Sequence, residues 1–327
     1  MKDHLCCELN RLQVPGKSSY ILYKTVSIYP LIEYVASTAS RRYKVYQIPK
    51  RNKTGKRTIA QPTKLVKLIQ QEIISEILSK FPIHECAKAY KKGSNIFENA
   101  FPHRNNHFLL KMDFANFFNS ITCNDWEIYL NEKKDIIKHF DFDASDITFL
   151  QNILFWTPKG TTDKILSIGA PSSPILSNIL LWNFDEQLSK YCKEKHVTYT
   201  RYADDLSFSC NECNKLKDVE TFVKKLCCEI SYPQLVINEN KTVHTSKKHN
   251  RHIAGITITN EGTLSLGYKR KIIIKSLIYK FLNNELDDKN KKYLKGILNF
   301  SQSIDRIFMN RMEQKYGKEN IQKILSY

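Results

Sequence analysis

Two adjacent carboxylates, Asp204 and Asp205, lie between two stretches, 197–202 and 206–209, that are rich in β-branched and aromatic residues. This pattern predicts two strands joined by a tight acidic turn. Carboxylates presented together at a hairpin tip could hold divalent metal ions, which prefer oxygen ligands. The segment could equally be an ordinary solvated hairpin turn, because Asp is a favoured turn residue. The rest of the sequence bears on which interpretation holds.

A third carboxylate, Asp113, ends the nearly continuous apolar run 108–112. Such a run predicts a buried strand that exposes only its last residue to a cleft. Two divalent ions about 4 Å apart are the arrangement that phosphoryl transfer uses, and a single hairpin tip cannot surround both. Asp113 is therefore the candidate third ligand beside Asp204 and Asp205.

The 327 residues carry a formal net charge of +18, and this excess is concentrated in two segments. Residues 41–71 contain ten Lys or Arg and no acid, and residues 268–327 contain fourteen Lys or Arg against six acids. Two basic segments around an acid-tipped middle predict a nucleic-acid channel with positive walls. Solvated helix faces are the alternative. The length allows one multi-lobed enzyme or two to three domains.

The nine cysteines lie at irregular spacings, and the sequence shows no signal peptide and no apolar run long enough to span a bilayer. These features favour a cytoplasmic protein with reduced thiols and no membrane partner. Cys210 and Cys213 have the spacing of a zinc knuckle, but no second pair follows at that spacing. A metal site at these cysteines is an alternative that the sequence supports only weakly.

The elements around these acids can be predicted from the pattern. Alternation over 43–48, a basic loop at 50–57 and a resumed strand at 58–60 predict a basic hairpin. The turn 169–174 precedes a helix predicted from Ile175 to about Tyr191, with Ser172 and Ser173 available as N-caps. The last 60 residues predict amphipathic helices. Their predicted inward residues are Ile273, Leu277, Phe281, Leu294, Ile297 and Leu298.

Three segments resemble motifs A, B and C of reverse transcriptases, in both order and spacing. They read Lys-Met-Asp-Phe-Ala-Asn-Phe-Phe at 111–118, Gly-Ala-Pro-Ser-Ser-Pro at 169–174 with Asn178, and Thr-Arg-Tyr-Ala-Asp-Asp-Leu at 200–206. They resemble most closely those of bacterial retron reverse transcriptases, whose Asn-Ala-x-x-His element is matched at 99–103. The resemblance runs from about Tyr43 to the C-terminus and favours the metal-site interpretation of Asp204 and Asp205.

This resemblance implies an α+β right-hand polymerase. Its parts would be an N-terminal helical extension at 1–42, fingers and a palm with an antiparallel sheet at 43–267, and a helical, RNA-binding thumb at 268–327. The family's site would carry two Mg²⁺ ions bridged by Asp113 and Asp204. Asp205 would lie near one ion or the primer end, and the backbone carbonyl of Phe114 would be a further ligand.

The resemblance also implies the residues that bind nucleotide and nucleic acid. Lys56 and Arg57 would clamp the triphosphate, Phe118 would exclude a 2′-hydroxyl, and Lys241 would protonate the leaving pyrophosphate. Residues implied to contact nucleic acid are Asn99, His103, Gly255, Lys269 and Arg270.

Two positions depart from the family's pattern. Ser167-Ile168 replaces the usual Pro-Gln before the motif B glycine, so the glutamine's contact is missing. Ile253-Ala254-Gly255 replaces the Val-Thr-Gly that is linked with RNA recognition, so Ala254 has no hydroxyl to offer.

By resemblance the function is that of an RNA-directed DNA polymerase of a retron. It would use dNTPs to copy part of a cognate structured non-coding RNA into single-stranded DNA, as a branched RNA–DNA product (msDNA), and would serve antiphage defence with an effector protein. The sequence ends after the thumb, so RNA removal is expected from a separate host RNase H. The alternatives are a group II intron-like or diversity-generating reverse transcriptase, and a non-catalytic RNA-binding scaffold of the same fold.

Overall fold

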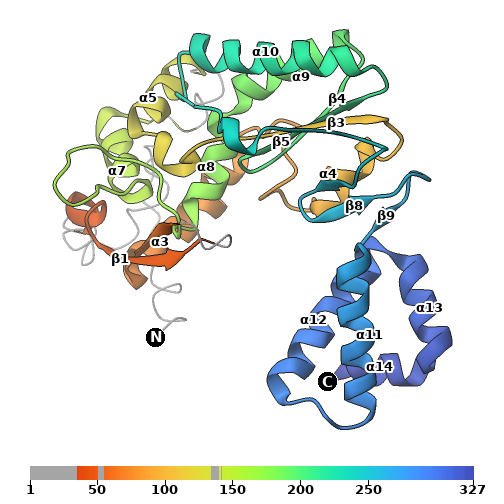
Figure 1. The fold of residues 1–327 in the computed structure, drawn as a ribbon. Helices are drawn as coiled ribbons and strands as arrows, with labels where there is room; N and C mark the ends of the chain where they lie inside the picture. Colours follow the sequence, from red (N-terminus) through yellow and green to blue (C-terminus); the bar gives the residue numbers. More distant parts are fainter. Residues whose placement is uncertain (1–34, 51–54, 134–139, 141) are drawn as a thin grey trace. The chain divides into compact units, whose positions relative to one another are not determined.

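The computed structural model describes residues 35–50, 55–133, 140 and 142–327. The chain divides into two compact units, each built from segments far apart in the sequence (Figure 1). Unit 1 comprises Met1–Lys91, Phe114–Lys190 and Thr221–Asn238, and unit 2 comprises Lys92–Asp113, Tyr191–Glu220 and Glu239–Tyr327. Most of the predicted N-terminal extension, 1–34, and the tip of the predicted basic loop, 51–54, lie outside the described residues.

Unit 1 contains the predicted basic hairpin. Strands β1 (Tyr43–Pro49) and β2 (Lys56–Pro62) pair antiparallel, from Tyr43 opposite Pro62 to Pro49 opposite Lys56. Among its described residues, unit 1 includes the α-helices α3 (Lys64–Glu76), α5 (Cys123–Glu132), α7 (Ala144–Leu154), α8 (Ser172–Leu180) and most of α9 (Trp182–Glu194). Between α3 and α7, Nε2 of the buried Gln70 donates to the carbonyl of Ile153 over 2.7 Å and links the two helices inside an otherwise apolar core.

The helix predicted from Ile175 to Tyr191 is two helices, so that prediction is wrong in its boundaries. The chain leaves helical geometry at Leu181, between α8 and α9. The prediction of Ser172 and Ser173 as N-caps is also wrong, because Pro171 occupies the cap position of α8. Both serines are buried in the first turn. The Ser172 hydroxyl donates to the carbonyl of Leu154, and the Ser173 hydroxyl accepts from the amide of Ser167.

Unit 2 contains a four-stranded antiparallel sheet in the order β4–β5–β3–β6. Its strands are β3 (Phe108–Asp113), β4 (Thr198–Tyr202), β5 (Asp205–Cys210) and β6 (Val243–Ser246). The bounds of β3 agree with the predicted strand 108–113, and β4 and β5 confirm the predicted acidic hairpin. Consecutive residues Leu109 and Leu110 of β3 point to opposite faces of the sheet, and both are buried. Both faces of this central strand are therefore covered, which explains its nearly continuous apolar sequence.

The remaining elements of unit 2 surround this sheet. A short helix α4 (Ile96–Ala100) and a 3₁₀ turn η2 (Phe101–His103) precede β3, and a second sheet is formed by β7 (Arg251–Ile253), β8 (Ile256–Ile258) and β9 (Leu264–Ser265). Another 3₁₀ turn, η4, spans Glu239–Lys241. Helix α10 (Cys213–Glu229) follows β5 and belongs partly to each unit.

The C-terminal segment folds as four helices: α11 (Tyr268–Leu282), α12 (Asp288–Ile304), α13 (Arg306–Tyr316) and α14 (Lys318–Ser326). Their buried side chains share one core with the β7–β9 sheet. The prediction that Ile273 faces inward is wrong, because it is 47% exposed and Ile274 is buried instead. In the part of the chain that the structure describes, no helix combines the length and the apolar character needed to cross a bilayer.

Candidate active site

Asp113 and Asp205 lie directly opposite each other at the ends of two neighbouring strands. Asp113 is the last residue of β3, Asp205 is the first residue of β5, and the two are register partners. Asp204 precedes Asp205 in the two-residue turn between β4 and β5. The backbone therefore brings the three predicted carboxylates to one edge of the sheet, from two separate segments of the sequence.

The turn that carries Asp204 is stabilised by a buried arginine. Ala203 has a left-handed backbone with φ of 59°, a conformation that costs a non-glycine residue on the order of 1 kcal/mol. The guanidinium of the fully buried Arg201 donates to the carbonyl of Ala203 over 3.1 Å. This charge-assisted hydrogen bond stabilises the strained turn that carries Asp204.

Lys241 contacts Asp113 at the same edge. Its Nζ lies 2.8 Å from Oδ1 and 3.0 Å from Oδ2 of Asp113, a side chain that is almost fully buried. This hydrogen bond raises the pKa of Lys241, so the lysine stays charged. Both residues were predicted site residues, and they lie 128 positions apart in the sequence.

The electrostatics of the carboxylates indicate a site that lacks positive charge. Desolvation, followed by the negative charges of Asp204 and Asp113, raises the pKa of Asp205 to about 7, and Asp205 also forms a hydrogen bond with Asp113. Lys241 counteracts this effect only partly. Like charges held together raise the pKa of one of them, and a divalent cation would remove that penalty. Hard oxygen ligands in this number fit Mg²⁺.

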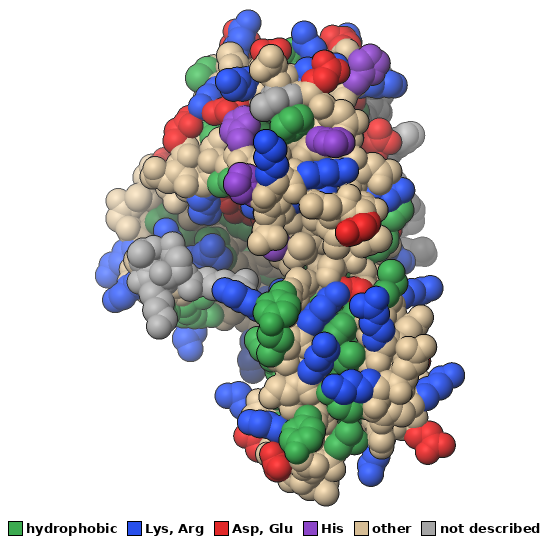
Figure 2. Space-filling model, turned by 45° about the vertical axis from the view of Figure 1, so that its right-hand side comes forward, with side chains coloured by type: hydrophobic (Ala, Val, Ile, Leu, Met, Phe, Trp, Pro, Cys, Tyr) green, Lys and Arg blue, Asp and Glu red, His purple; other side chains and the backbone are tan. Residues whose placement is uncertain are grey.

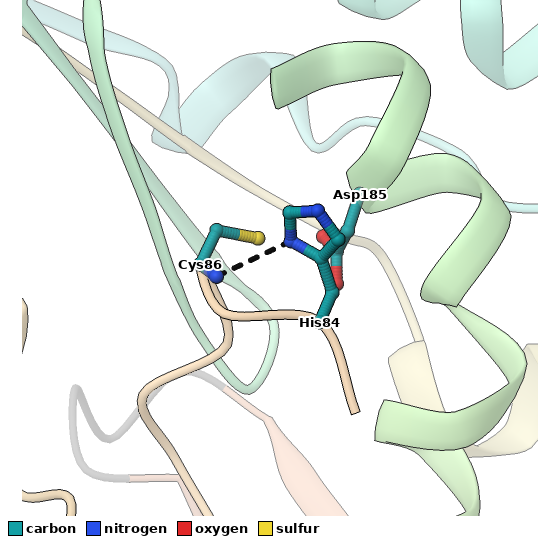
Figure 3. A group of neighbouring side chains, drawn as sticks. All are labelled: His84, Cys86 and Asp185. Atoms are coloured by element: carbon teal, nitrogen blue, oxygen red, sulfur yellow. Dashed lines mark hydrogen bonds between the residues drawn. The ribbon is translucent and has the colours of Figure 1, made fainter. Parts of the chain in front are cut away.

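The three carboxylates do not converge as tightly as bound-metal ligands do. Among the described residues, His84, Cys86 and Asp185 of unit 1 are the group whose potential ligand atoms all lie within 4.8 Å of one another (Figure 3). In that buried group, His84 Nδ1 accepts from the Cys86 amide over 3.2 Å, and Nε2 lies 3.1 Å from a carboxylate oxygen of Glu186. Both ring nitrogens of His84 are thus engaged by groups of the protein itself.

The residues after Asp113 belong to unit 1. Phe114 is buried, and its backbone bridges to Ile237. Phe117 is also buried and stacks on Phe114 with ring centroids 5.7 Å apart, whereas Phe118 is half-buried and its ring centroid lies 6.4 Å from that of Tyr90. Phe117 is thus a core residue, and of the two only Phe118 presents a partly accessible ring.

The motif B turn is packed against the finger hairpin inside unit 1. The carbonyl of Ile168 accepts from the amide of Ala60 in β2 over 2.9 Å. Gly169 has a left-handed φ of 123°, and a Cβ there would lie 3.0 Å from Gln61 Cγ and 3.1 Å from the Ala60 carbonyl oxygen. Ile168 therefore acts here through its backbone. The predicted triphosphate residues Lys56 and Arg57 lie at the exposed start of the same strand.

The structure gives Asn99 and His103 a different place from the predicted one. Each is only 1% exposed, and His103 hydrogen-bonds to Thr200 on β4 and Ser209 on β5. Neither side chain is accessible to nucleic acid in this structure, and both lie behind the hairpin that carries Asp204 and Asp205. Sequence reasoning missed Thr200 and Ser209, because short hydroxyl side chains in a strand give no signal of their own.

The other predicted nucleic-acid residues lie near the second sheet and on α11. Ala254 and Gly255 both have left-handed backbones, as a two-residue hairpin turn requires. The guanidinium of Arg270 donates to the carbonyl of Gly255 over 3.2 Å and lies over the ring of Phe300, whereas Lys269 is exposed. Arg270 therefore contacts other parts of the protein, whereas the side chain of Lys269 is accessible to a binding partner.

One face of α11 combines cations with exposed aromatic rings. Tyr268, Ile272, Lys275 and Tyr279 share this face by their helical spacing, and Tyr268 is 79% exposed. Figure 2 shows Lys and Arg side chains gathered around hydrophobic ones over the part of the surface where α11 to α14 lie. Such a combination suits a nucleic-acid backbone and its bases.

Residues 48–258 match the family model described as "Reverse transcriptase (RNA-dependent DNA polymerase)". The chain is 42% identical over 293 residues to the retron Ec83 reverse transcriptase of Escherichia coli, covering 89% of this chain and 92% of that protein. The chain belongs to the bacterial retron reverse transcriptases. It is also similar to the retron Ec86 reverse transcriptase of Escherichia coli, at 26% identity over 96% of this chain and 93% of that protein.

The retron enzyme also matches solved structures. One is apo telomerase from Candida tropicalis, with a TM-score of 0.47 and 11% identity, covering 99% of this chain and 69% of that chain. Another is a foamy viral protease-reverse transcriptase with double-stranded DNA, with a TM-score of 0.45 and 12% identity, covering 98% of this chain and 49% of that chain. As a reverse transcriptase, this enzyme is an RNA-directed DNA polymerase of the α+β right-hand class, so it handles an RNA template and a DNA product.

Proposed function

We propose that this retron reverse transcriptase performs two-metal nucleotidyl transfer at Asp113, Asp204 and Asp205. The observation that carries the proposal is the direct pairing of Asp113 with Asp205 at two strand ends, with Asp204 in the adjoining turn. Asp113, Asp204 and Asp205 would hold the two Mg²⁺ ions, with the backbone carbonyl of Phe114 as a further ligand.

Side chains of the protein would carry out the remaining steps of the reaction. When bound, the two ions supply activation of the attacking hydroxyl and neutralisation of the departing pyrophosphate. Lys241, a charged donor beside Asp113, would give its proton to the pyrophosphate. Lys56 and Arg57 would bind the triphosphate, and the ring of Phe118 would exclude nucleotides that carry a 2′-hydroxyl.

The template is proposed to be part of a cognate structured RNA held by the C-terminal helices. The exposed cations and aromatic rings of α11 support this proposal, because they fit an RNA backbone and unstacked bases. Initiation would use a guanosine 2′-hydroxyl of the same RNA and give a branched RNA–DNA product, msDNA. A separate host RNase H would remove the copied RNA, and the enzyme would act with an effector protein in antiphage defence.

The catalytic proposal is tested by primer extension with dNTPs and Mg²⁺. Asp204→Asn should lose incorporation by at least about 10³-fold, whereas Asp218→Asn, which alters an exposed carboxylate on α10, should leave the rate unchanged. Equal incorporation by the wild type and Asp204→Asn would remove Asp204 from the mechanism and favour a non-catalytic scaffold.

The product proposal has a separate test. Nucleic acid that co-purifies with the full chain from cells is extracted, sequenced and treated with a debranching enzyme. We expect one structured RNA joined to single-stranded DNA, with a shift in mobility after debranching. DNA that does not shift would contradict the branched product while leaving the polymerase activity intact, as expected for a group II intron-like or diversity-generating enzyme.

A further inference from the structure

A buried histidine joins the two strands that carry the catalytic turn. His103 Nδ1 lies 2.7 Å from the hydroxyl of Ser209 on β5, and its Nε2 lies 2.8 Å from the hydroxyl of Thr200 on β4. The amide of Asn106 donates to Ser209 over 2.7 Å and to Thr198 over 3.1 Å. One short segment before β3 thus holds both strands of the hairpin through side chains.

The hydrogen-bond partners fix the direction of every donor in this network. The Thr200 hydroxyl donates to the backbone carbonyl of Asn99 over 3.2 Å, so its oxygen accepts from His103 Nε2–H. Because burial keeps the ring neutral and Nε2 carries its one proton, Nδ1 accepts from the Ser209 hydroxyl, whose oxygen accepts from the amide of Asn106. Each group then donates and accepts without conflict, and this requires the neutral Nε2–H tautomer of His103.

Burial agrees with this assignment. Desolvation lowers the pKa of His103 to about 3, so the ring is neutral over the range in which polymerases work. The ring nitrogens hydrogen-bond to the hydroxyls of Thr200 and Ser209, and these hydroxyls in turn contact the Asn99 carbonyl and the Asn106 amide. None of these groups titrates in that range. A fully satisfied buried network of this kind specifies one arrangement of the elements that it joins.

The network lies behind the carboxylates and not among them. Ser209 is four residues after Asp205 on β5, which corresponds to roughly 13 Å along the strand, and Thr200 lies on β4 four residues before Asp204 in the turn. By strand alternation, Ser209 and Asp205 share one face of β5. A change in the register or twist of the two strands at Thr200 and Ser209 would therefore move both carboxylates at the tip.

We propose that His103 is a positioning residue for catalysis, which sets the place of Asp204 and Asp205 by bridging Thr200 and Ser209. The inference rests on the proposed catalytic role of Asp204 and Asp205. It assigns to the Asn-Ala-x-x-His element a function inside the palm, because the side chains of Asn99 and His103 are both buried.

The first test compares His103→Phe, which loses both hydrogen bonds, with His103→Gln, which can still donate to Thr200. We expect kcat for dNTP incorporation per folded molecule to fall about 10- to 100-fold in His103→Phe, with KM for dNTP nearly unchanged and partial rescue in His103→Gln. The exposed His107 supplies the matched control, His107→Gln, which should behave as wild type. A loss of thermal stability with normal kcat would overturn the proposal.

A second test is a double-mutant cycle that combines Thr200→Val with His103→Phe. Thr200→Val should lower kcat in the wild type but add little in His103→Phe, because the bond that it removes is already absent. Additive losses would mean that the two residues act independently and would overturn the bridge.

The third readout does not depend on activity. In NMR spectra of protein with ¹⁵N-labelled histidine, the ring-nitrogen resonances that are absent from His103→Gln belong to His103. These resonances should report one protonated and one unprotonated nitrogen, and their chemical shifts should not change between pH 5 and pH 8. A titration near the ordinary pKa of 6.5 would contradict the network itself. If Asp204→Asn kept full activity, the catalytic proposal would fail. The spectrum would still show whether His103 is the neutral Nε2–H tautomer, because it does not depend on activity.

Discussion

Lys241 binds both oxygens of the Asp113 carboxylate, at 2.8 Å and 3.0 Å from its Nζ. A cation of the protein itself therefore occupies a position beside the carboxylates that we propose as metal ligands. Because Lys241 is more than half exposed while Asp113 is almost fully buried, the lysine can leave at little cost and the aspartate cannot. Lys241 thus has two expected effects: competition with the metal before nucleotide binds, and proton donation afterwards.

Substitution of Lys241 should separate these two effects. Lys241→Met should bind Mn²⁺ about two- to fivefold more tightly in the absence of nucleotide, as expected for removing a partly exposed ion pair. The same variant should lose roughly 10²-fold in single-turnover incorporation, because a general acid is missing. Electron paramagnetic resonance titration and rapid quench measure the two quantities. Lys248→Met, on an exposed lysine nearby in the sequence, is the control, and weaker Mn²⁺ binding by Lys241→Met would contradict the competition.

The stability of the metal-free protein should depend on pH through Asp205. Its pKa is raised from 3.8 to about 7 in the folded state, so the folded protein binds the extra proton between these values. Its contribution to the free energy of unfolding is therefore greatest at the acidic end of this window and is lost as pH rises through about 7. In EDTA, the wild type should lose roughly 2–4 °C more in Tm between pH 5 and pH 8 than Asp205→Asn.

Mg²⁺ provides the control for that pH dependence. At pH 8 it should raise the Tm of the wild type more than that of Asp205→Asn, because the cation relieves the repulsion among the carboxylates. A difference between the two proteins that stays constant from pH 5 to pH 8 would show that Asp205 does not titrate in this window.

Phe118 should decide between deoxynucleotides and ribonucleotides. Its ring is half-buried, whereas the neighbouring Phe117 is buried in the core. Phe118→Val should raise the relative kcat/KM for ribonucleotides about 10- to 100-fold by removing the steric barrier. Phe117→Leu should instead lower Tm and leave discrimination unchanged. If discrimination persists in Phe118→Val, another residue contacts the sugar.

Lys269 and Arg270 should differ although they are neighbours in the sequence. Lys269 is exposed, so Lys269→Ala should weaken RNA binding and reduce the slope of log Kd against log salt by about 1. Arg270 contacts the carbonyl of Gly255 and the ring of Phe300, so Arg270→Ala should also lower Tm. Filter binding at several salt concentrations distinguishes them, and Tyr268→Ala should weaken binding without changing the slope. An unchanged slope in Lys269→Ala would exclude a phosphate contact.

The sequence by itself determined the strands that carry Asp113, Asp204 and Asp205. The apolar run that ends at Asp113 has one interpretation, a buried strand with an acid at its end, and the structure places β3 at those residues. The hairpin around Asp204 and Asp205 could also be predicted from the sequence, because β-branched residues and a two-residue acidic turn are local signals. The order of the three motifs then predicted the family.

Only the tertiary structure decided which neighbours these residues have. The three consecutive isoleucines 272–274 give no preferred helix face, and packing against the second sheet selected Ile274 for the core. The pattern also could not reveal that His103 supports the hairpin or that Lys241 reaches Asp113. Such contacts depend on side chains about 100 or more positions apart, and their geometry is set by packing and not by local propensity.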